Sequence, residues 1–494
     1  MAQRNFLLTV LICSTFYLSN AQFTPSSFAP RIDFPLSTGV FNAQGLTSAD
    51  LNGDGKPDLI VGSVNTSTIR ILKNTSSGTT ISVDSPQFLL TSIATVNEIA
   101  TGDLDGDDKP DIVACPTSSA GNSFSIFRNT STTSALSFAA RIDIASSNYP
   151  ASVRIFDADG DGKNDIVVIN YYSNTISVFR NTSTGIGNIS FATKVDYSTG
   201  SYPGNLDVGD IDGDGKIDIA VLNDGDSSIS VYKNNSTSGI VSFSSPILLH
   251  TPSTPAHAQI VDIDGDGKKD IACTNFYGFN FTIFRNTSSG GTVSFASRVD
   301  VPIDTGTAYA QGIAIADYDG DGKPDIAASD HNYARVVVFK NATTSGTITS
   351  SSFSNKCYYP TGIKPNELIT VDMDGDGDMD IISSNYQGYS VSILQNRRID
   401  VGINSFIEKK FSFSLWPNPV KTFINIDNPT NETLTVKLFD FTGKQLFNFK
   451  PVSNDQMDGS ALLTINVSAL KSGNYLLIIE SSDGKYFCKK FIKE

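Results

Sequence analysis

The chain has 494 residues, which predicts two or more domains because a typical domain holds about 100–200 residues. Its 36 Lys and Arg residues oppose 51 Asp and Glu residues, and the net charge of −15 argues against a nucleic-acid-binding protein, which needs basic patches. An apolar fraction of 39% is enough for a hydrophobic core and excludes a protein with many membrane spans. Only six of the 51 acidic residues are Glu, whereas Asp is the acid that loops and hard-cation sites favour.

The first 21 residues have the pattern of a secretory signal peptide. Arg4 precedes an apolar run from Phe6 to Leu18, and small residues end at Ala21, a candidate cleavage site. The apolar run is shorter than the ~20 residues that a membrane-spanning helix needs. We therefore predict that residues 1–21 are a signal peptide and that the mature chain is exported, with an uncleaved anchor as the alternative.

A nine-residue Asp-rich loop then recurs seven times, with first residues spaced 53, 54, 53, 52, 55 and 55 apart. Asp or Asn occupies positions 1, 3, 5 and 9, and Gly occupies position 4 in every copy and position 6 in six copies. Calcium takes about six to eight oxygen ligands, and carboxylates on alternate residues of a tight turn can converge on one ion. Glycine permits the positive φ that such a turn requires. The loops therefore predict up to seven Ca²⁺ sites.

Each predicted metal site uses the side chains at positions 1, 3, 5 and 9 and the backbone carbonyl at position 7. In chain order the residues are Asp50, Asn52, Asp54, Lys56, Asp58; Asp103, Asp105, Asp107, Lys109, Asp111; Asp157, Asp159, Asp161, Lys163, Asp165; Asp210, Asp212, Asp214, Lys216, Asp218; Asp262, Asp264, Asp266, Lys268, Asp270; Asp317, Asp319, Asp321, Lys323, Asp325; and Asp372, Asp374, Asp376, Asp378, Asp380.

Two other interpretations of the loops are weaker. An EF-hand begins in a similar way but needs a bidentate Glu at position 12 and a following helix. No copy has that Glu, and β-like residues follow each loop. The second alternative is a solvated acidic turn without metal, which is less favourable because four neighbouring carboxylates repel one another unless a cation neutralises them.

Each repeat contains the same four β-like runs, one before the Asp loop, one directly after it, an alternating third run, and a fourth after a Ser/Thr/Gly/Asn-rich turn. Short strands, Gly-rich turns and the lack of helical periodicity predict an all-β fold, a seven-bladed β-propeller over residues 22–398. The chain starts with an orphan fourth strand at Ser27–Asp33, and no fourth strand follows Leu394. We therefore predict that the N-terminal strand completes the seventh blade and closes the ring.

The loops and strands resemble those of FG-GAP/VCBS-type propeller repeats, the calcium-loop blades also found in integrin α-chain heads. The resemblance covers about residues 22–398. It implies the propeller fold and metal ligands at the loop positions given above. The Phe-Gly and Gly-Ala-Pro elements that named the family are not evident, so an integrin-like partner is not implied.

Near Arg397 the repeats stop, and after a linker at residues 399–410 the segment 411–494 alternates like a small β-sandwich. This segment resembles the type A sorting domain of the type IX secretion system of Bacteroidetes, through the Trp416-Pro-Asn-Pro stretch, the Gly473-Asn-Tyr-Leu stretch and a Lys-rich end. The resemblance implies recognition by the type IX secretion machinery and export, with surface attachment or release. An ordinary adhesive sandwich domain is the alternative.

No group of residues has the spacing of a known active site, since the sequence lacks a zinc-type Cys/His cluster, a nucleophile elbow and a phosphate loop. The turns between second and third strands should lie on the face opposite the Asp loops. Exposed aromatic residues there suit sugar stacking or a protein partner, although they could instead pack between blades. The candidate ligand-binding residues are Tyr171, Tyr172, Tyr277, His331, Tyr333, Tyr386 and Tyr389.

Taken together, these features predict a secreted or cell-surface calcium-binding propeller that acts as a non-catalytic adhesion module for a glycan or a protein. Two alternatives stay open. One is a polysaccharide-degrading, lyase-like propeller, and the other is a purely structural protein of the cell envelope or matrix.

Overall fold

The computed structural model describes residues 23, 27–36, 40–91, 95–116, 122–304, 308–397, 415–416, 419–428, 434–440, 445–452, 461–481 and 486–494. The predicted signal peptide and linker lie outside these residues. Residues 21–398 form one compact unit, and residues 399–494 belong to another. Among the described residues, no helix is long and apolar enough to cross a lipid bilayer.

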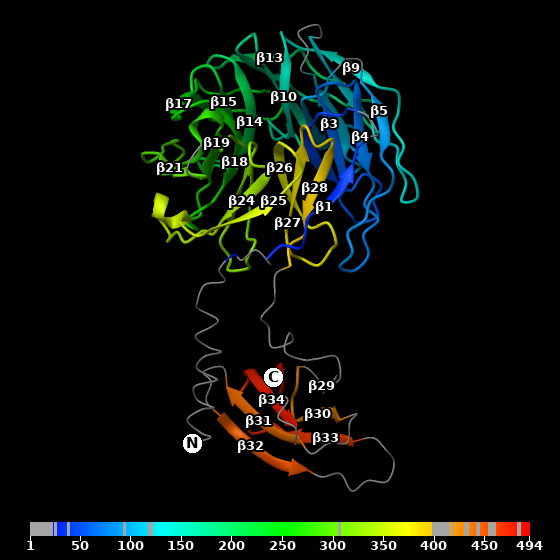
Figure 1. The fold of residues 1–494 in the computed structure, drawn as a ribbon, viewed down its shortest axis with the longest axis vertical. Helices are drawn as coiled ribbons and strands as arrows, with labels where there is room; N and C mark the ends of the chain where they lie inside the picture. Colours follow the sequence, from blue (N-terminus) through cyan, green and yellow to red (C-terminus); the bar gives the residue numbers. More distant parts are fainter. Residues whose placement is uncertain are drawn as a thin grey trace. The chain divides into compact units, whose positions relative to one another are not determined.

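The first unit contains seven four-stranded antiparallel sheets arranged as the blades of a propeller (Figure 1), which confirms the predicted fold. The first strands of neighbouring blades contact one another around the whole ring, including β26 with β2, so they are the innermost strands. These strands are β2 (Ala43–Ala49), β6 (Glu98–Gly102), β10 (Pro150–Phe156), β14 (Pro203–Gly209), β18 (Pro255–Val261), β22 (Ala310–Ala316) and β26 (Pro365–Val371).

An Asp loop follows each innermost strand, and the second strand begins at position 9 of that loop. The second strands are β3 (Asp58–Ser63), β7 (Asp111–Cys115), β11 (Asp165–Asn170), β15 (Asp218–Asn223), β19 (Asp270–Asn275), β23 (Asp325–Asp330) and β27 (Asp380–Asn385). Every residue of these strands is buried, because neighbouring blades cover both faces. This explains their continuous apolar runs.

The third and fourth strands complete each blade towards its rim. The third strands are β4 (Thr68–Leu72), β8 (Ser123–Phe127), β12 (Thr175–Phe179), β16 (Ser228–Tyr232), β20 (Asn280–Phe284), β24 (Arg335–Phe339) and β28 (Ser390–Leu394). The fourth strands of blades 1 to 6 are β5 (Gln87–Leu90), β9 (Ile142–Ala145), β13 (Val195–Ser198), β17 (Ile247–His250), β21 (Val299–Pro302) and β25 (Lys356–Pro360). Short 3₁₀ turns are η1 (Phe276–Gly278) and η2 (Ser350–Phe353).

The seventh blade takes its fourth strand from the other end of the unit. Strand β1 (Ile32–Pro35) pairs antiparallel with β28, and a bridge between Phe28 and Asn396 extends the pairing (Figure 1, blue beside yellow). The predicted closure is confirmed, with the regular strand a few residues later than the predicted Ser27–Asp33. Closure leaves no open sheet between the first and last blades.

The hydrophobic core of the propeller is divided into seven clusters, one between each pair of neighbouring blades. The cluster between blades 3 and 4, for example, joins Val167 and Val178 to Leu206 and Val221. Near the axis the blades approach so closely that a Cβ at Gly45 would lie 2.7 Å from the carbonyl oxygen of Asn97. Each blade is therefore stabilised mainly by its two neighbours.

A buried Asn after each third strand links neighbouring blades. The backbone N–H of Asn234 donates to Asp218 Oδ1 (2.7 Å), and its Nδ2 donates to the carbonyl of Ala158 in the preceding blade (2.9 Å). The same inter-blade bond is made by Asn74, Asn129, Asn181, Asn286, Asn341 and Asn396. The bond from Asn74 to Met373 O joins the first blade to the seventh, so the linkage runs around the complete ring.

The second unit has two antiparallel sheets, as a small sandwich requires. One sheet contains β29 (Leu415–Trp416), β30 (Phe423–Asn428) and β33 (Ala461–Asn466), and the other contains β31 (Leu434–Asp440), β32 (Gln445–Val452), β34 (Gly473–Ser481) and β35 (Tyr486–Lys493). Ile424 and Ile465 from the first sheet share one buried cluster with Val436, Leu438 and Leu477 from the second. The cluster makes the two sheets a single packed unit.

Replacing Asn234 by Ala should lower the free energy of unfolding by about 1–3 kcal/mol, because the buried carbonyl of Ala158 would lose its donor. Thermal or urea unfolding measures the change. The adjacent, exposed Asn235 provides the matched control. Equal losses in Asn234→Ala and Asn235→Ala would contradict the inter-blade role.

Candidate functional site

The Asp loops are curled by hydrogen bonds to the first carboxylate. In the fifth loop, Asp262 accepts the backbone N–H groups of Gly265 and Gly267, both at 2.8 Å, through its two oxygens. Both glycines have positive φ, 72° and 87°. In the second loop Asp108 takes the place of the second glycine and adopts a φ of 63°. The backbone thus wraps around position 1 as the sequence pattern predicts.

Position 9 is buried in all seven loops, and each of its oxygens accepts one backbone N–H. In the fifth loop Asp270 accepts from Ile263 (3.0 Å) and from Asn286 (2.7 Å). Burial raises the pKa of these carboxyls above its usual value, despite the two donors. The pKa is about 6 for Asp58, Asp165 and Asp218, about 7 for Asp111, Asp270 and Asp380, and about 8 for Asp325.

Positions 1, 3 and 9 converge, with ligand oxygens within 4.8 Å of one another in each cluster. The clusters include Asp103, Asp105, Asp111; Asp157, Asp159, Asp165; Asp210, Asp212, Asp218; Asp262, Asp264, Asp270; and Asp317, Asp319, Asp325. Position 5 is outside these clusters, and its Oδ1 accepts the N–H of position 7, as in Asp266 and Lys268 (3.0 Å). In these five loops the carboxylates at positions 1, 3 and 9 are therefore the closely grouped ones.

Two loop oxygens give a direct test of whether a cation fits. Asp105 Oδ1 and Asp374 Oδ1, both at position 3, are buried and have no hydrogen-bond partner among the described residues. The other oxygen of Asp374 accepts from Gln395 Nε2 at 2.7 Å. A buried carboxylate oxygen without a donor is unfavourable unless a cation approaches it. The donor set, oxygen only and mostly anionic, fits a hard divalent cation such as Ca²⁺.

The sequence analysis missed a basic residue that each of six loops receives from the end of the third strand. The pairs are Lys73–Asp54 (3.6 Å), Arg128–Asp105 (3.6 Å), Arg180–Asp161 (3.9 Å), Lys233–Asp214 (3.2 Å), Arg285–Asp264 (2.8 Å) and Lys340–Asp321 (2.8 Å). These Lys and Arg side chains neutralise part of the negative charge of the loops. Repulsion between the loop carboxylates is therefore weaker evidence for a bound metal than the sequence alone indicated. The residue recurs 15 positions after position 9 in five of these loops and 17 positions after it in the second, so the signal was present in the sequence.

A group of charged residues lies on the innermost strands near the axis. Arg154 on β10 donates to Glu98 Oε1 on β6 (2.9 Å), and its Nε lies 3.7 Å from Asp207 Oδ1 on β14. Glu367 on β26 accepts the backbone N–H of Leu46 at 2.6 Å. Burial raises the pKa of all three carboxyls, and they share one guanidinium. Carboxyl groups therefore outnumber cations near the axis.

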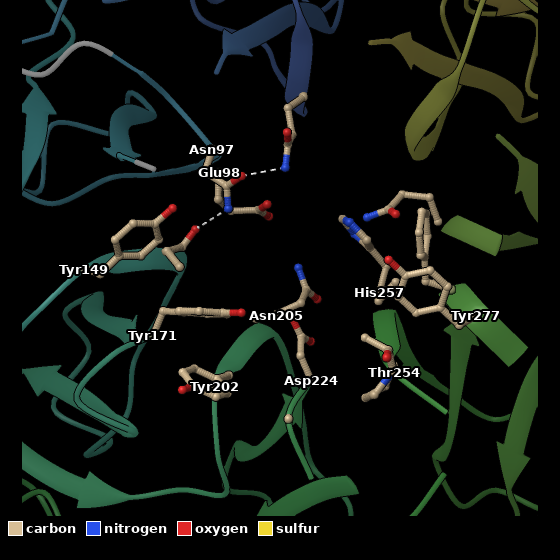
Figure 2. A pocket seen from close by; sticks show the side chains of 18 of the residues that line it. Asn97, Glu98, Tyr149, Tyr171, Tyr202, Asn205, Asp224, Thr254, His257 and Tyr277 are labelled. Atoms are coloured by element: carbon tan, nitrogen blue, oxygen red, sulfur yellow. Dashed lines mark hydrogen bonds between the residues drawn. The ribbon is translucent and has the colours of Figure 1, made fainter. Parts of the chain in front are cut away.

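A cavity of about 630 Å³ opens where the innermost strands begin, on the face opposite the Asp loops (Figure 2). Its aromatic lining consists of Tyr149, Tyr171, Tyr172, Tyr202, Phe276 and Tyr277, and its polar lining includes Gln44, Asn97, Glu98, Asn205, Asp224, Thr254, His257 and Gln311. Figure 2 shows Tyr149, Tyr171 and Tyr202 on one side of the cavity, His257 and Tyr277 on the other, and Asn205 and Asp224 between them. The volume is that of a typical small-molecule site.

The aromatic rings on each side of the cavity pack against one another. Tyr171 contacts Tyr149, Tyr172 and Tyr202, with ring centroids 5.2–5.5 Å apart. On the opposite side Phe276 contacts Tyr277 at 4.9 Å. Tyr172 and Tyr277 nevertheless keep 50% and 60% of their surface exposed, so their rings remain available to a ligand.

The structure divides the seven candidate ligand-binding residues into two groups. Tyr171, Tyr172 and Tyr277 line the cavity. The other four lie outside it and contact neighbouring residues instead. His331 Nδ1 lies 3.2 Å from Pro365 O, Tyr386 lies 6.5 Å from the His331 ring, Tyr333 covers the Arg335 guanidinium, and Tyr389 O accepts from Leu36.

Sequence reasoning also missed most of the polar lining of the cavity. Asn205, Asp224 and Gln311 belong to no motif, because each comes from a different position of its repeat. Glu98, which lines the cavity, could have been noticed, since the whole chain has only six Glu and Glu367 near the axis occupies the same repeat position, five residues before an Asp loop.

Comparison with known families agrees with this architecture. The FG-GAP-like repeat matches six overlapping segments, residues 50–114, 109–168, 157–221, 210–273, 262–328 and 317–383. Each segment runs from one Asp loop through the next. The secretion system C-terminal sorting domain matches residues 414–494. This domain indicates export through type IX secretion to the cell surface or the extracellular space.

Comparison with individual proteins adds information on the fold alone. No curated protein sequence matches the chain. A crystal structure of BBS1N in complex with ARL6DN, soaked with lead, is 12% identical, with a TM-score of 0.50, and the match covers 76% of this chain and 98% of that one. The same complex soaked with mercury has the same identity and coverage and a TM-score of 0.49.

The pKa of the His257 imidazole is lowered from 6.5 to about 4, first by burial and then by the nearby Arg154 guanidinium. Below pH 6.5 the unfolded chain binds a proton there that the folded chain rejects, so this residue should reduce stability as the pH falls from about 6.5 to about 4. His257→Gln should remove that part of the acid sensitivity. Chemical unfolding at several pH values tests this, and parallel stability curves for both proteins would contradict it.

Proposed function

The chain belongs to the FG-GAP-like repeat family, and we propose that it is an exported, calcium-binding, non-catalytic module that holds a carbohydrate in the cavity opposite its Asp loops. The observation that carries this proposal is the cavity itself. Tyrosine rings on two sides and amide and carboxyl groups between them are the groups that stack on sugar rings and bond to sugar hydroxyls.

The form of the cavity favours a carbohydrate over a folded protein. A stable protein–protein interface buries about 800 Å² on each partner, spread over a broad surface. Here six aromatic residues are gathered within one hollow of about 630 Å³ instead. Tyr333 and Tyr386, which lie outside the hollow, contact residues of the propeller.

The metal part of the proposal rests on the loops. Positions 1, 3 and 9 supply converging carboxylates, and the unpartnered oxygens of Asp105 and Asp374 point to a cation near position 3. Bound calcium would add fixed positive charge to each loop. The loops lie at the far ends of the innermost strands from the cavity, so we assign calcium a structural role. Up to seven ions are expected.

Calcium should stabilise the full chain against unfolding. A site filled at 100 times its dissociation constant adds about 2.7 kcal/mol. Asp105→Asn should reduce the calcium-dependent rise in melting temperature because it removes a position-3 carboxylate, and Asn52→Asp should increase it because it supplies the carboxylate that the first loop lacks. Differential scanning calorimetry with calcium or a chelator measures both. Identical melting curves in the two conditions would rule out the metal role.

Tyr171→Ala and Tyr277→Ala should each weaken carbohydrate binding by about tenfold, because each removes a ring from one side of the cavity. The best oligosaccharide from a glycan array serves as the probe in calorimetric titrations. Tyr333→Ala is the matched control, since Tyr333 is an exposed tyrosine of the same face outside the cavity. Equal effects of all three substitutions, or turnover of the bound oligosaccharide, would count against the proposal.

A further inference from the structure

Blade 4 places an unused hydrogen-bond acceptor in the cavity. Asn205 lies on β14 and is only 3% exposed, and its Oδ1 is buried without a hydrogen-bond partner in the part of the chain that the structure describes. Its side chain lines the cavity beside Asp224 (Figure 2). A buried amide oxygen normally has a donor, so this oxygen is suited to a donor supplied by a ligand.

The same blade supplies a carboxylate without a partner. Asp224 follows β15, and its backbone N–H donates to Tyr202 O (2.9 Å). Its carboxyl group forms no hydrogen bond or ion pair with any residue in the described part of the chain. Desolvation raises its pKa to about 7. A Cβ at Gly204 would lie 2.7 Å from either Asp224 oxygen, so the absence of a side chain there makes room for this carboxyl group.

Tyrosine rings surround this pair of acceptors. Tyr171 lies close enough to Asp224 for the carboxylate charge to raise the pKa of its hydroxyl, after the larger effect of burial. Tyr202 packs against Gly225, the next residue after Asp224. The face of a tyrosine ring attracts cations. A protonated amine placed here would meet a carboxylate, an amide oxygen and aromatic rings together.

The charge of the cavity disfavours anions. Its lining, as far as the structure describes it, includes the carboxyl groups of Glu98 and Asp224 and no Lys or Arg. The nearby guanidinium of Arg154 is already engaged by Glu98 and Asp207. A sugar with a carboxylate or sulfate group would therefore have no cation to bind and would be repelled.

We propose that the cavity selects an amino sugar, a glycan residue with a free protonated amine that binds Asp224 and the Asn205 oxygen while its ring stacks on the tyrosines. This inference rests on the proposed carbohydrate-binding function and specifies its ligand. A neutral sugar would leave the Asp224 carboxylate without a cation. N-acetylation of the amine would remove the charge that matches it.

The test compares four oligosaccharides by calorimetric titration of the full chain at neutral pH in millimolar calcium. They are the β-1,4 tetramers of glucosamine, N-acetylglucosamine and glucose, and a galacturonic acid oligomer. The glucosamine tetramer should bind at least about tenfold more tightly than the other three, because a hydrogen bond between charged groups contributes that much. Asp224→Asn should abolish this preference, so that the glucosamine tetramer binds no more tightly than the glucose tetramer.

Asp226→Asn is the matched control, because Asp226 lies in the same turn, is exposed and does not line the cavity. It should leave all four affinities unchanged. Asp224→Asn should fold, since it removes a desolvated charge, and its melting temperature verifies this. Binding of all four oligosaccharides without preference would overturn the amino-sugar inference alone. No binding of any saccharide, with binding of a lysine-rich peptide instead, would overturn the proposed carbohydrate function as well.

Discussion

The buried aspartate that begins each second strand is the group on which the propeller depends. One of its oxygens fixes the Asp loop through the N–H of position 2, and the other fixes the turn after the third strand through the N–H of a buried Asn. That Asn then binds a carbonyl in the preceding blade. A single carboxyl group in each blade therefore couples the shape of the loop to the spacing between blades.

This coupling is repeated seven times, so the face of the ring that carries the Asp loops is nearly uniform. On the opposite face, the residue type differs from blade to blade. Five residues before the loops, the innermost strands carry Gly45, Glu98, Ser152, Asn205, His257, Gly312 and Glu367. No two neighbouring blades present the same chemistry there. The asymmetric cavity is the result, and its ligand preference can differ between related propellers that share the same loops and blade contacts.

The sequence was sufficient to predict the seven blades, because repetition makes every strand and loop visible seven times. It also predicted ring closure, since the strand missing after Leu394 matched the extra strand near Phe28. The cavity could not be predicted in the same way. Asn205 and Asp224 are unique to their blade, and only the curvature of the ring brings them near Tyr171 and Tyr277. Repeated sequence patterns predict the blades, whereas the residues of the cavity occur once each and form no pattern that can be recognised in the sequence.

Closure by β1 has a consequence for how the chain matures. The seventh sheet joins segments more than 350 residues apart, as in the pairing of Ile32 with Ile393, so it forms only after nearly the whole propeller has been synthesised. Proteins that depend on contacts of such long range in the sequence fold slowly. A product that ends before β28 would leave β1 without its partner strand and the ring open, with edges exposed to proteases and to aggregation. Only a chain that contains both β1 and β28 can therefore close the ring, so fragments differ from intact molecules in their exposed strand edges.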